Sequence, residues 1–495
     1  MHRNERYVIG IDSSTQSVKA IAWTREGEPR FEGRAPHTLS SPDAYRSEQD
    51  PDEWWSAATI ALKAVTDAID PASIDGVAIS NQRETMALLG IDRRPLAPAT
   101  VWLDRRARDM TRILSDELGV ETLHSISGKP VDVIPCIYRL RWLRAHQPDL
   151  LDKAAYILSV HDYLVMRLSG HPQATWTSAD PFGIFDIVAK TWSGKLLDHL
   201  KISEDKLPPL NPPASRIGVI SQEAAIATGL RAGTPIYAAG GDGHCAGLGV
   251  GAIEPGTVYL NLGTAVVGGV WSANPELSSY WRTLVSPTGD GYMLESVQRS
   301  GAFFVNWLLD NFAGGRADPT LFQRLESEAM RLPVGSDGLT VCPYLVGCMD
   351  PHWDENAHAT FTGLGSDHGM GHLYRASLEA ITLEFTRALE QMQAKGLATH
   401  RIFVIGGGAS STLWRKMVAD ATGLPVHRSL SNEASALGAG MSAAVGAGWF
   451  ATFRDAASAM SRTTEAIPPD LAAHDDWTGL SKRQARVYLN NSGKL

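Results

Sequence analysis

The sequence is poor in cysteine, and its four cysteines do not form any Cys-x-x-Cys pair. A chain of 495 residues with so few cysteines is not a disulfide-stapled scaffold, because such scaffolds are short and cysteine-dense. Reduced thiols, as found in the cytoplasm, are the simplest interpretation of these four residues: Cys136, Cys245, Cys342 and Cys348.

Positive charge is also scarce, since 45 Lys and Arg residues face 54 Asp and Glu residues. The net charge is -9, and the basic residues do not gather into a block or stripe. Because proteins that bind nucleic acid need such a basic footprint, a nucleic-acid partner is not expected.

Long hydrophobic runs are missing as well. The N-terminus reaches a strand-like run at Tyr7–Ile11 without an apolar signal core, so a signal peptide is not expected. The uncharged run Ala436–Phe453 is long enough to raise the question of a membrane span, yet it is rich in glycine and alanine. We therefore predict a buried helix packed against a sheet, no membrane association, and a cytoplasmic protein.

What the sequence does contain is an alternation of strand and helix patterns. Apolar runs at Tyr7–Asp12, Val18–Trp23 and Ile74–Ile79 are typical of strands, and Glu53–Ile69 has apolar residues at helical spacing. Such alternation predicts an α/β fold with a central sheet.

One strand–turn–strand pattern occurs twice. Thr15 lies three residues after Asp12 in the first copy, and Thr264 lies three residues after Asn261 in the second. The repeat indicates a duplicated domain, with a boundary shortly after Asp242. We predict one domain over residues 1–246 and a second over 247–495.

A third element is rich in glycine. A buried-type strand from Arg401 runs into Gly406-Gly-Gly-Ala-Ser410, and a helix is predicted over Thr412–Thr422. Glycines at a strand–helix turn allow a ligand to approach the backbone, and a helix N-terminus attracts anions.

The Asp12 turn offers a carboxylate for a magnesium ion, and hydroxyl and N–H groups for phosphate oxygens. Taken alone, it can equally be an ordinary hairpin turn capped by polar residues. The sequence lacks the Gly-x-x-x-x-Gly-Lys-Ser/Thr motif, so it is not a P-loop protein.

Taken together, these segments resemble the FGGY carbohydrate kinases, which include xylulokinases and glycerol kinases, over almost the full length. The resemblance rests on the order and spacing of several motifs: Ser47-Glu-Gln-Asp-Pro-Asp-Glu-Trp-Trp55, Asn81-Gln-Arg-Glu-Thr85, Gly240-Gly-Asp-Gly-His244, Asn261-Leu-Gly-Thr264, Gly406-Gly-Gly-Ala-Ser410 and Glu433-Ala-Ser-Ala-Leu-Gly-Ala-Gly440. It implies two actin/hexokinase-like (ribonuclease H-like) domains with a cleft between them.

The resemblance also implies an activity, the transfer of a phosphate from Mg-ATP to a hydroxyl of a small sugar or polyol. Asp242 would be the general base, and Asp12 would orient the metal and water near the phosphates, so both are expected near Mg²⁺. For Asp242 the alternative is a plain turn residue after two glycines. The ATP contacts implied are Ser14, Thr15, Gln16, Gly263, Thr264, Gly407 and Gly408.

Substrate contacts are implied at Gln82, Arg83, Glu84, Trp102 and Asp242. Arg83 and Glu84 could instead form a surface ion pair, and Trp102 could be a core residue. The Arg83–Glu84 pair is like that of glycerol kinases, whereas xylulokinases usually have Met-His there. Two further departures are Ile134, where glycerol kinases have a tyrosine, and Cys348–Met349, where the family has Glu-Arg.

Three functions therefore remain open at this point. A ketopentose kinase, such as one for xylulose, is the leading hypothesis. A glycerol- or erythritol-type polyol kinase is the first alternative, and a non-catalytic sugar sensor of the same fold is the second. The resemblance further implies closure of the two domains about a hinge and a possible homodimer.

Overall fold

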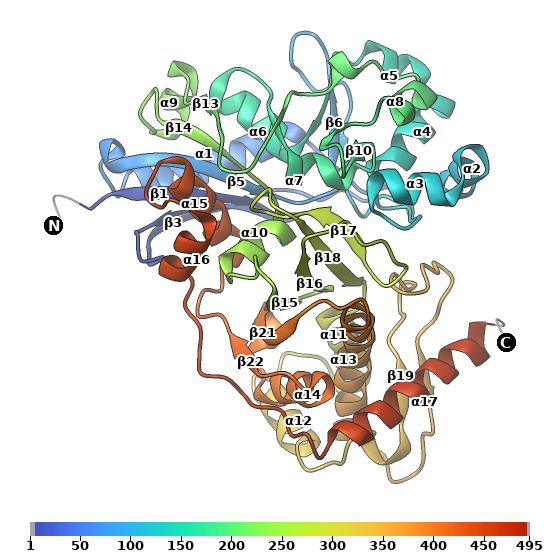
Figure 1. Cartoon of the computed structure of the whole chain (residues 1–495). Coiled ribbons are helices and arrows are strands. Elements are labelled where there is room, and N and C mark those ends of the chain that lie inside the picture. Colours follow the sequence, from blue (N-terminus) through green and yellow to red (C-terminus); the bar gives the residue numbers. More distant parts are fainter. Residues whose placement is uncertain (1–4, 493–495) are drawn as a thin grey trace.

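The computed structural model describes residues 5–492, which fold around two six-stranded sheets (Figure 1). The first sheet has the strand order β13-β14-β5-β1-β2-β3. Its strands are β1 (Tyr7–Ser13), β2 (Ser17–Trp23), β3 (Pro29–Pro36), β5 (Ile74–Asn81), β13 (Arg216–Val219) and β14 (Pro235–Gly241).

The second sheet has the order β17-β18-β16-β15-β21-β22. Its strands are β15 (Gly256–Leu262), β16 (Val266–Ser272), β17 (Arg282–Val285), β18 (Tyr292–Gln298), β21 (Thr399–Ile405) and β22 (Val426–Arg428). In both sheets an antiparallel hairpin continues into a parallel neighbour, β5 beside β1 and β21 beside β15. The predicted repeat of the hairpin and the predicted α/β class are therefore confirmed.

Alternate residues of the first strands face opposite layers, as the pleat of a strand requires. Ile9 and Ile11 of β1 pack into the same core as helix α1 (Pro51–Thr66), whereas Val8 packs with α10 (Asp242–Gly249) and α15 (Ala434–Gly446). In the second sheet, Val258 and Leu260 of β15 face α13 (Met370–Ala394) and α14 (Thr412–Thr422).

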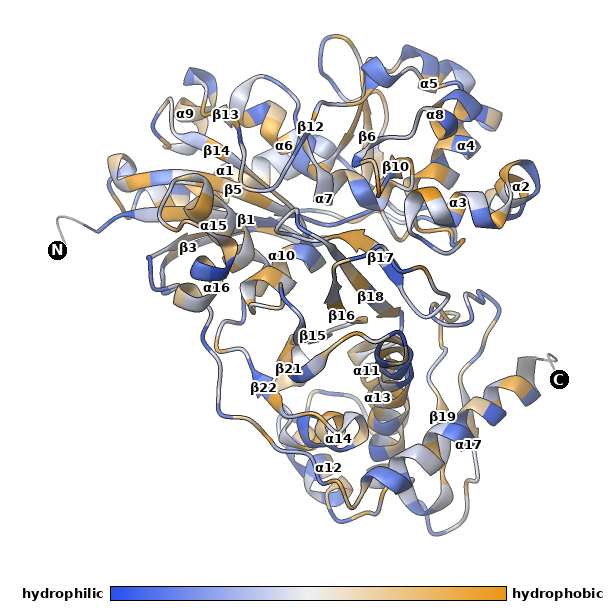
Figure 2. Ribbon diagram, viewed as in Figure 1, coloured by the Kyte–Doolittle hydropathy of each residue, from blue (hydrophilic) through white to orange (hydrophobic). Residues whose placement is uncertain are grey.

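Helix α10 lies between the two sheets (Figure 1). Tyr259 of β15 packs against it from the second sheet. Figure 2 shows hydrophobic residues on α10, α15 and β17, where the two halves meet. The predicted boundary between residues 246 and 247 falls inside α10, and α15 returns from the second half to cover the first sheet. The boundary itself stays a prediction. The two predicted domain ranges also include residues 1–4 and 493–495, which lie outside the described residues.

Further elements surround the two sheets. The first half inserts α2 (Arg108–Leu118), α3 (Val120–Ser127), α4 (Cys136–His146), α5 (Pro148–Lys153), α6 (Val160–Ser169), α7 (Trp176–Ala179), α8 (Gly194–Leu200) and α9 (Gln222–Thr228), with the small strands β6 (Met86–Leu89) and β8 (Tyr156–Ser159). The second half adds α11 (Ala302–Phe312), α12 (Leu321–Ala329), α16 (Phe453–Met460) and α17 (His474–Ser492).

The uncharged run over residues 436–453 contributes to a buried helix against the first sheet, as predicted. It is not one helix, because α15 ends at Gly446 and α16 begins only at Phe453. Within residues 5–492, helices long and apolar enough to cross a membrane are absent.

Glycine and alanine are frequent in α15 because α10 and the first sheet pack directly on its backbone. A Cβ atom built on Gly438 would lie 1.9 Å from the carbonyl oxygen of Cys245 in α10. A Cβ built on Gly10 of β1 would lie equally close to the carbonyl oxygen of Ala436. Backbone atoms cannot rotate away, so these positions require glycine.

We expect Gly438→Ala to lower the free energy of unfolding by about 2 kcal/mol or more, measured in urea. The clash with a backbone carbonyl outweighs the ~1 kcal/mol that alanine gains over glycine in a helix. The matched control is Gly479→Ala in α17, where the added Cβ would meet no atom within 4 Å. That variant should be as stable as the wild type or up to about 1 kcal/mol more stable. Equal stability of both variants would contradict the close-packing explanation.

Candidate active site

Three parallel strand ends bring the predicted catalytic residues together. Asp12 at the end of β1 lies opposite Ser80 of β5, and Gly240 of β14 lies opposite Ser80 from the other side. Ligands in α/β sheets bind beyond the carboxyl ends of such strands. Strand β14 ends at Gly241, and Asp242 is the first residue of α10.

The glycines before Asp242 make room for neighbouring side chains. A Cβ atom on Gly241 would lie 2.6 Å from the side-chain carbons of Arg83, and one on Gly240 would lie 1.9 Å from Thr177 Oγ1. The Gly-Gly-Asp sequence thus lets the Arg83 side chain pass across the backbone and reach the Asp242 carboxylate.

The Asp242 side chain keeps 41% of its surface exposed. Its Oδ1 atom accepts a hydrogen bond from the backbone N–H of Gly243 at 2.7 Å and lies 3.3 Å from Nε of Arg83. Burial raises the pKa of Asp242, and the positive charge of Arg83 opposes that shift. A carboxylate that is held in place but still open can accept a proton from a bound hydroxyl.

Asp12 lies next to this carboxylate and accepts a hydrogen bond from Ser80 Oγ at 2.8 Å. Burial raises the pKa of Asp12 to about 7, and the nearby charge of Asp242 adds to the shift. Within the described chain, groups of three or more His, Cys, Asp or Glu side chains that could enclose a metal are absent. Two carboxylates fit Mg²⁺ bound together with phosphates, because this ion keeps waters and rarely uses a cage made only of protein.

The turns of the two hairpins are held by the surrounding chain. In the first turn, Ser14 Oγ donates to the carbonyl of Ser17 at 3.0 Å, and the carbonyl of Thr15 accepts from Gln49 Nε2 at 2.7 Å. Gln16, also predicted to contact ATP, is exposed at the tip. In the second turn, the carbonyl of Thr264 accepts from the backbone N–H of Gly301, just before α11.

The glycine-rich element lies beside the second hairpin. Strand β21 pairs in parallel with β15, which sets Ile405 opposite Asn261. A Cβ on Gly406 would lie 2.4 Å from Asn261 Oδ1, so this glycine permits the contact between the two turns. Gly407 is exposed and a Cβ there would meet nothing within 4 Å, while Gly408 packs on Trp414. The structure thus leaves open backbone at Gly407, directly after the glycine that lies against Asn261.

The predicted sugar loop is buried and bonded on both sides. Gln82 is 1% exposed and its amide donates to Gln49 Oε1 at 2.8 Å, so it supports the loop from inside. Arg83 and Glu84 do not form the alternative surface ion pair, because both are buried and pair with the second half of the chain. Trp102 donates from Nε1 to Thr15 Oγ1 at 2.9 Å and packs on a small apolar cluster that includes Ile134.

Comparison with known proteins matches both halves of the chain. The N-terminal domain of the FGGY family of carbohydrate kinases matches residues 7–249, and the C-terminal domain matches residues 258–447. The chain belongs to the FGGY family of carbohydrate kinases. As predicted, it is a carbohydrate kinase with two actin/hexokinase-like domains, and its family implies ATP as the phosphate donor. Because the family is one of kinases, we no longer consider the alternative of a non-catalytic sugar sensor.

Individual FGGY relatives carry more than one substrate name. The chain is 28% identical to a xylulose kinase of Bacillus subtilis, over 94% of this chain and 93% of the relative. It is 25% identical to a gluconokinase of the same organism, over 88% and 86%. A crystal structure of xylulose kinase from Rhodospirillum rubrum has a TM-score of 0.91 and 29% identity, over 98% of this chain and 99% of that one.

The sequence did not single out the residues of this kinase that hold Arg83 and Glu84. Glu295 and Arg282, both buried, lie on β18 and β17 of the second sheet. Burial alone would raise the pKa of Glu295, but the charges of Arg83 and Arg282 outweigh it and lower the pKa to about 2. The sequence signal that could have identified Glu295 is a single glutamate within a strand of otherwise apolar or neutral residues, Tyr292–Gln298.

His244, two residues after Asp242, is also buried within this group of charges. Neither of its ring nitrogens has a hydrogen-bond partner among the described residues, and Nε2 lies 4.0 Å from an Asp180 oxygen. Burial lowers its pKa to about 3, so the ring is neutral. Asp180 itself forms a buried ion pair with Lys129 and accepts from the backbone N–H of Val285 at 2.6 Å.

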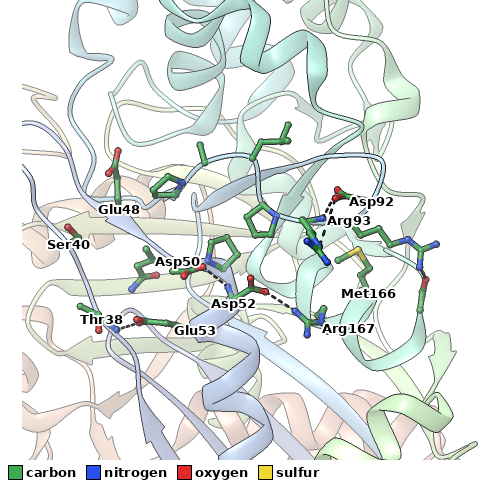
Figure 3. Close-up of a pocket in the computed structure, with 18 of the residues that line it drawn as sticks. Thr38, Ser40, Glu48, Asp50, Asp52, Glu53, Asp92, Arg93, Met166 and Arg167 are labelled. Carbon is green, nitrogen blue, oxygen red and sulfur yellow. Dashed lines mark hydrogen bonds and ion pairs between the residues drawn. The ribbon is translucent and has the colours of Figure 1, made fainter.

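The kinase also has a cavity of about 1100 Å³ in its first half (Figure 3). It lies between the start of α1, the loop after β6 and the end of α6, where Asp52 pairs with Arg167 at 2.9 Å. Of the described residues that line it, none belongs to the predicted site. Gln49 lines the cavity and also donates a hydrogen bond to the carbonyl of Thr15 in the first turn.

Proposed function

We propose that this kinase transfers the terminal phosphate of ATP to a hydroxyl of a ketopentose such as xylulose, with Asp242 as the general base. The observation that carries the proposal is the Asp242 carboxylate, open to the cleft, oriented by Arg83 and adjacent to Asp12. The names of the xylulose kinases among its relatives support the substrate class.

In the proposed mechanism, Asp242 accepts the proton of the attacking hydroxyl as the oxygen forms its bond to the γ-phosphorus of ATP. The bond from that phosphorus to the bridging oxygen of the β-phosphate breaks, and ADP leaves with its electron pair. Arg83 holds the carboxylate so that one oxygen faces the hydroxyl. The backbone N–H groups of the two turns, around Thr15 and Thr264, hold the phosphates in line for the transfer. Asp12 and Asp242 would hold Mg²⁺, which supplies positive charge to the phosphate oxygens when bound.

A polyol such as glycerol or erythritol is the second candidate substrate. The observation that favours it is the Arg83–Glu84 pair, because the guanidinium and carboxylate together match the donors and acceptors of adjacent hydroxyls. In the structure both groups already have protein partners, so a polyol would have to share them.

A substrate panel tests the proposal. We expect xylulose to give a kcat/KM at least about tenfold above glycerol, erythritol and gluconate, because a site built around hydroxyl partners discriminates against molecules that leave those partners unpaired. The measurement is sugar-dependent ADP release at saturating Mg-ATP, with each compound at equal concentration. Preference for a polyol would replace the leading proposal with the second, and the absence of turnover with every sugar and polyol would remove both.

A further inference from the structure

The buried carboxylate of Glu295 is the point where the two halves of the molecule meet beside the base. Its oxygens accept hydrogen bonds from Arg83 Nη1 at 2.9 and 3.1 Å and from Arg282 Nη2 at 2.5 Å. Tyr259 of β15 adds a hydrogen bond from its hydroxyl at 2.6 Å. Glu295 is 1% exposed, so these protein groups stand in for water.

The contact crosses from the second sheet to the sugar loop of the first half. Arg282, which bonds Glu295, also donates from Nη1 to Glu84 Oε1 at 2.8 Å. Two consecutive residues of the loop, Arg83 and Glu84, are therefore both held by the second sheet. Members of a buried charge network fix one another, because each lost partner leaves a charge without solvation.

The guanidinium of Arg83 contacts two carboxylates in this network, those of Glu295 and Asp242. Its Nη1 atom bonds Glu295 at 2.9 Å, while its Nε atom lies 3.3 Å from Asp242 Oδ1. Because a guanidinium is planar and rigid, fixing Nη1 also fixes the direction of the Nε–H group. Glu295 thus takes the closer contact and keeps Arg83 from turning fully onto Asp242.

We propose that Glu295 is a positioning residue for phosphoryl transfer, which holds Arg83 so that Asp242 is oriented but not fully engaged by the guanidinium. This inference rests on the proposed role of Asp242 as the base. Since Glu295 comes from the second sheet and Asp242 follows a strand of the first, the base has this environment only when the two sheets are in contact. Glu295, which positions the sugar loop of the first half, therefore comes from the second half of the chain, the half predicted to bind ATP.

The test is a pair of substitutions measured together. In Glu295→Gln we expect kcat to fall about tenfold, because sub-ångström misplacement of a catalytic group has effects of this order, while the KM for ATP stays within about twofold. In the background of Arg83→Gln, the same Glu295→Gln change should have no further effect on kcat. Glu295→Asp, which keeps the charge, should recover part of the loss.

The matched control is Arg299→Gln. Arg299 follows β18 directly and also pairs across the two halves, with Asp132 at 3.0 Å, but it does not contact Arg83 or Asp242. Its kcat should stay within about twofold of the wild type, since it removes a cross-domain ion pair without moving the base. If Glu295→Gln does not fold, Tyr259→Phe removes only one hydrogen bond from Glu295 and should lower kcat about threefold, again only when Arg83 is present.

The outcomes separate this inference from the proposed function. A wild type that phosphorylates none of the sugars or polyols overturns the proposed function, and this inference with it. A wild type with sugar-dependent turnover, alongside Glu295→Gln or Tyr259→Phe with unchanged kcat, overturns the inference alone. Equal effects of Glu295→Gln with and without Arg83, or an equal loss in Arg299→Gln, would show a general structural role and also overturn it.

Discussion

In Asp242→Asn we expect sugar-dependent ADP release to fall about a thousandfold, since a positioned general base contributes roughly 10²–10⁴ to a rate. Asparagine has the shape of aspartate and can still accept the hydrogen bond from the Gly243 N–H group. It cannot take up the proton of the attacking hydroxyl. The measurement is kcat with the preferred sugar, together with binding of ATP in the absence of Mg²⁺ by calorimetry. That binding should change by less than about threefold, because the substitution leaves the turns proposed to hold the phosphates untouched.

Two comparisons make this result specific to the base. Asp242→Glu keeps the carboxylate but displaces it, so its kcat should lie between those of Asp242→Asn and the wild type. Thermal melts should show little change, because the side chain is 41% exposed and Arg83 keeps its closer partner, Glu295. Turnover in Asp242→Asn within about tenfold of the wild type would remove Asp242 from the role of base.

The hairpins that carry the site could be predicted from the sequence because their signal is local. An apolar strand, a short polar turn ending in Thr15 or Thr264 and a return strand occupy adjacent residues, and the pleat makes the pattern visible. The order of the strands within each sheet was not predicted from these patterns. It depends on which distant strand lies beside β1 or β15, and local patterns do not encode that.

The close crossing of α10 and α15 could not be predicted from periodicity. Gly438 and Cys245 lie in different halves of the sequence, and glycine at a helix position is also compatible with a weak or exposed helix. The abundance of glycine and alanine indicated close packing, but only the fold shows which backbone lies against which. The same limit explains why one helix is predicted for the uncharged run, although α15 ends at Gly446 and only Phe453 at the end of the run belongs to α16.

In the predicted sugar loop, the site residues could be selected from the sequence, but the residues that they contact could not. Arg83 and Glu84 follow a strand end and could be selected as site residues from the sequence. Their partners could not, because Glu295 lies 212 residues beyond Arg83 and Arg282 lies 198 beyond Glu84. A pair that could have been a surface ion pair is instead a buried link between the two sheets.

We expect Asp12→Asn to lower kcat about a hundredfold and to raise the Mg²⁺ concentration needed for half-maximal activity, because charge stabilisation by a bound metal contributes several kcal/mol to such a transfer. Asp12 and Asp242 are the two carboxylates proposed to hold the metal, and groups of three or more His, Cys, Asp or Glu side chains that could replace them are absent from the described residues. The measurement is kcat as a function of Mg²⁺ at fixed ATP and sugar.

The variant should fold, for two reasons. The second hairpin already has an asparagine, Asn261, at the position that Asp12 holds in the first, so the turn itself does not need a carboxylate. Burial also disfavours the charged form of Asp12, since it raises the pKa of this side chain to about 7. Asparagine oxygen can still accept the hydrogen bond from Ser80.

Asp350→Asn is the matched control for this prediction. Asp350 is likewise buried, burial raises its pKa to about 7, and it accepts a hydrogen bond from a serine hydroxyl, that of Ser296, at 2.5 Å. It bonds Ser296 and Val297 of β18 and is not one of the residues proposed to hold the metal, so its substitution should leave the Mg²⁺ dependence of kcat unchanged. If both variants shifted that dependence equally, the effect would come from the loss of a buried charge in general. If neither did, Asp12 would not hold the metal, and the charge beside the phosphates would have to come from Asp242 alone.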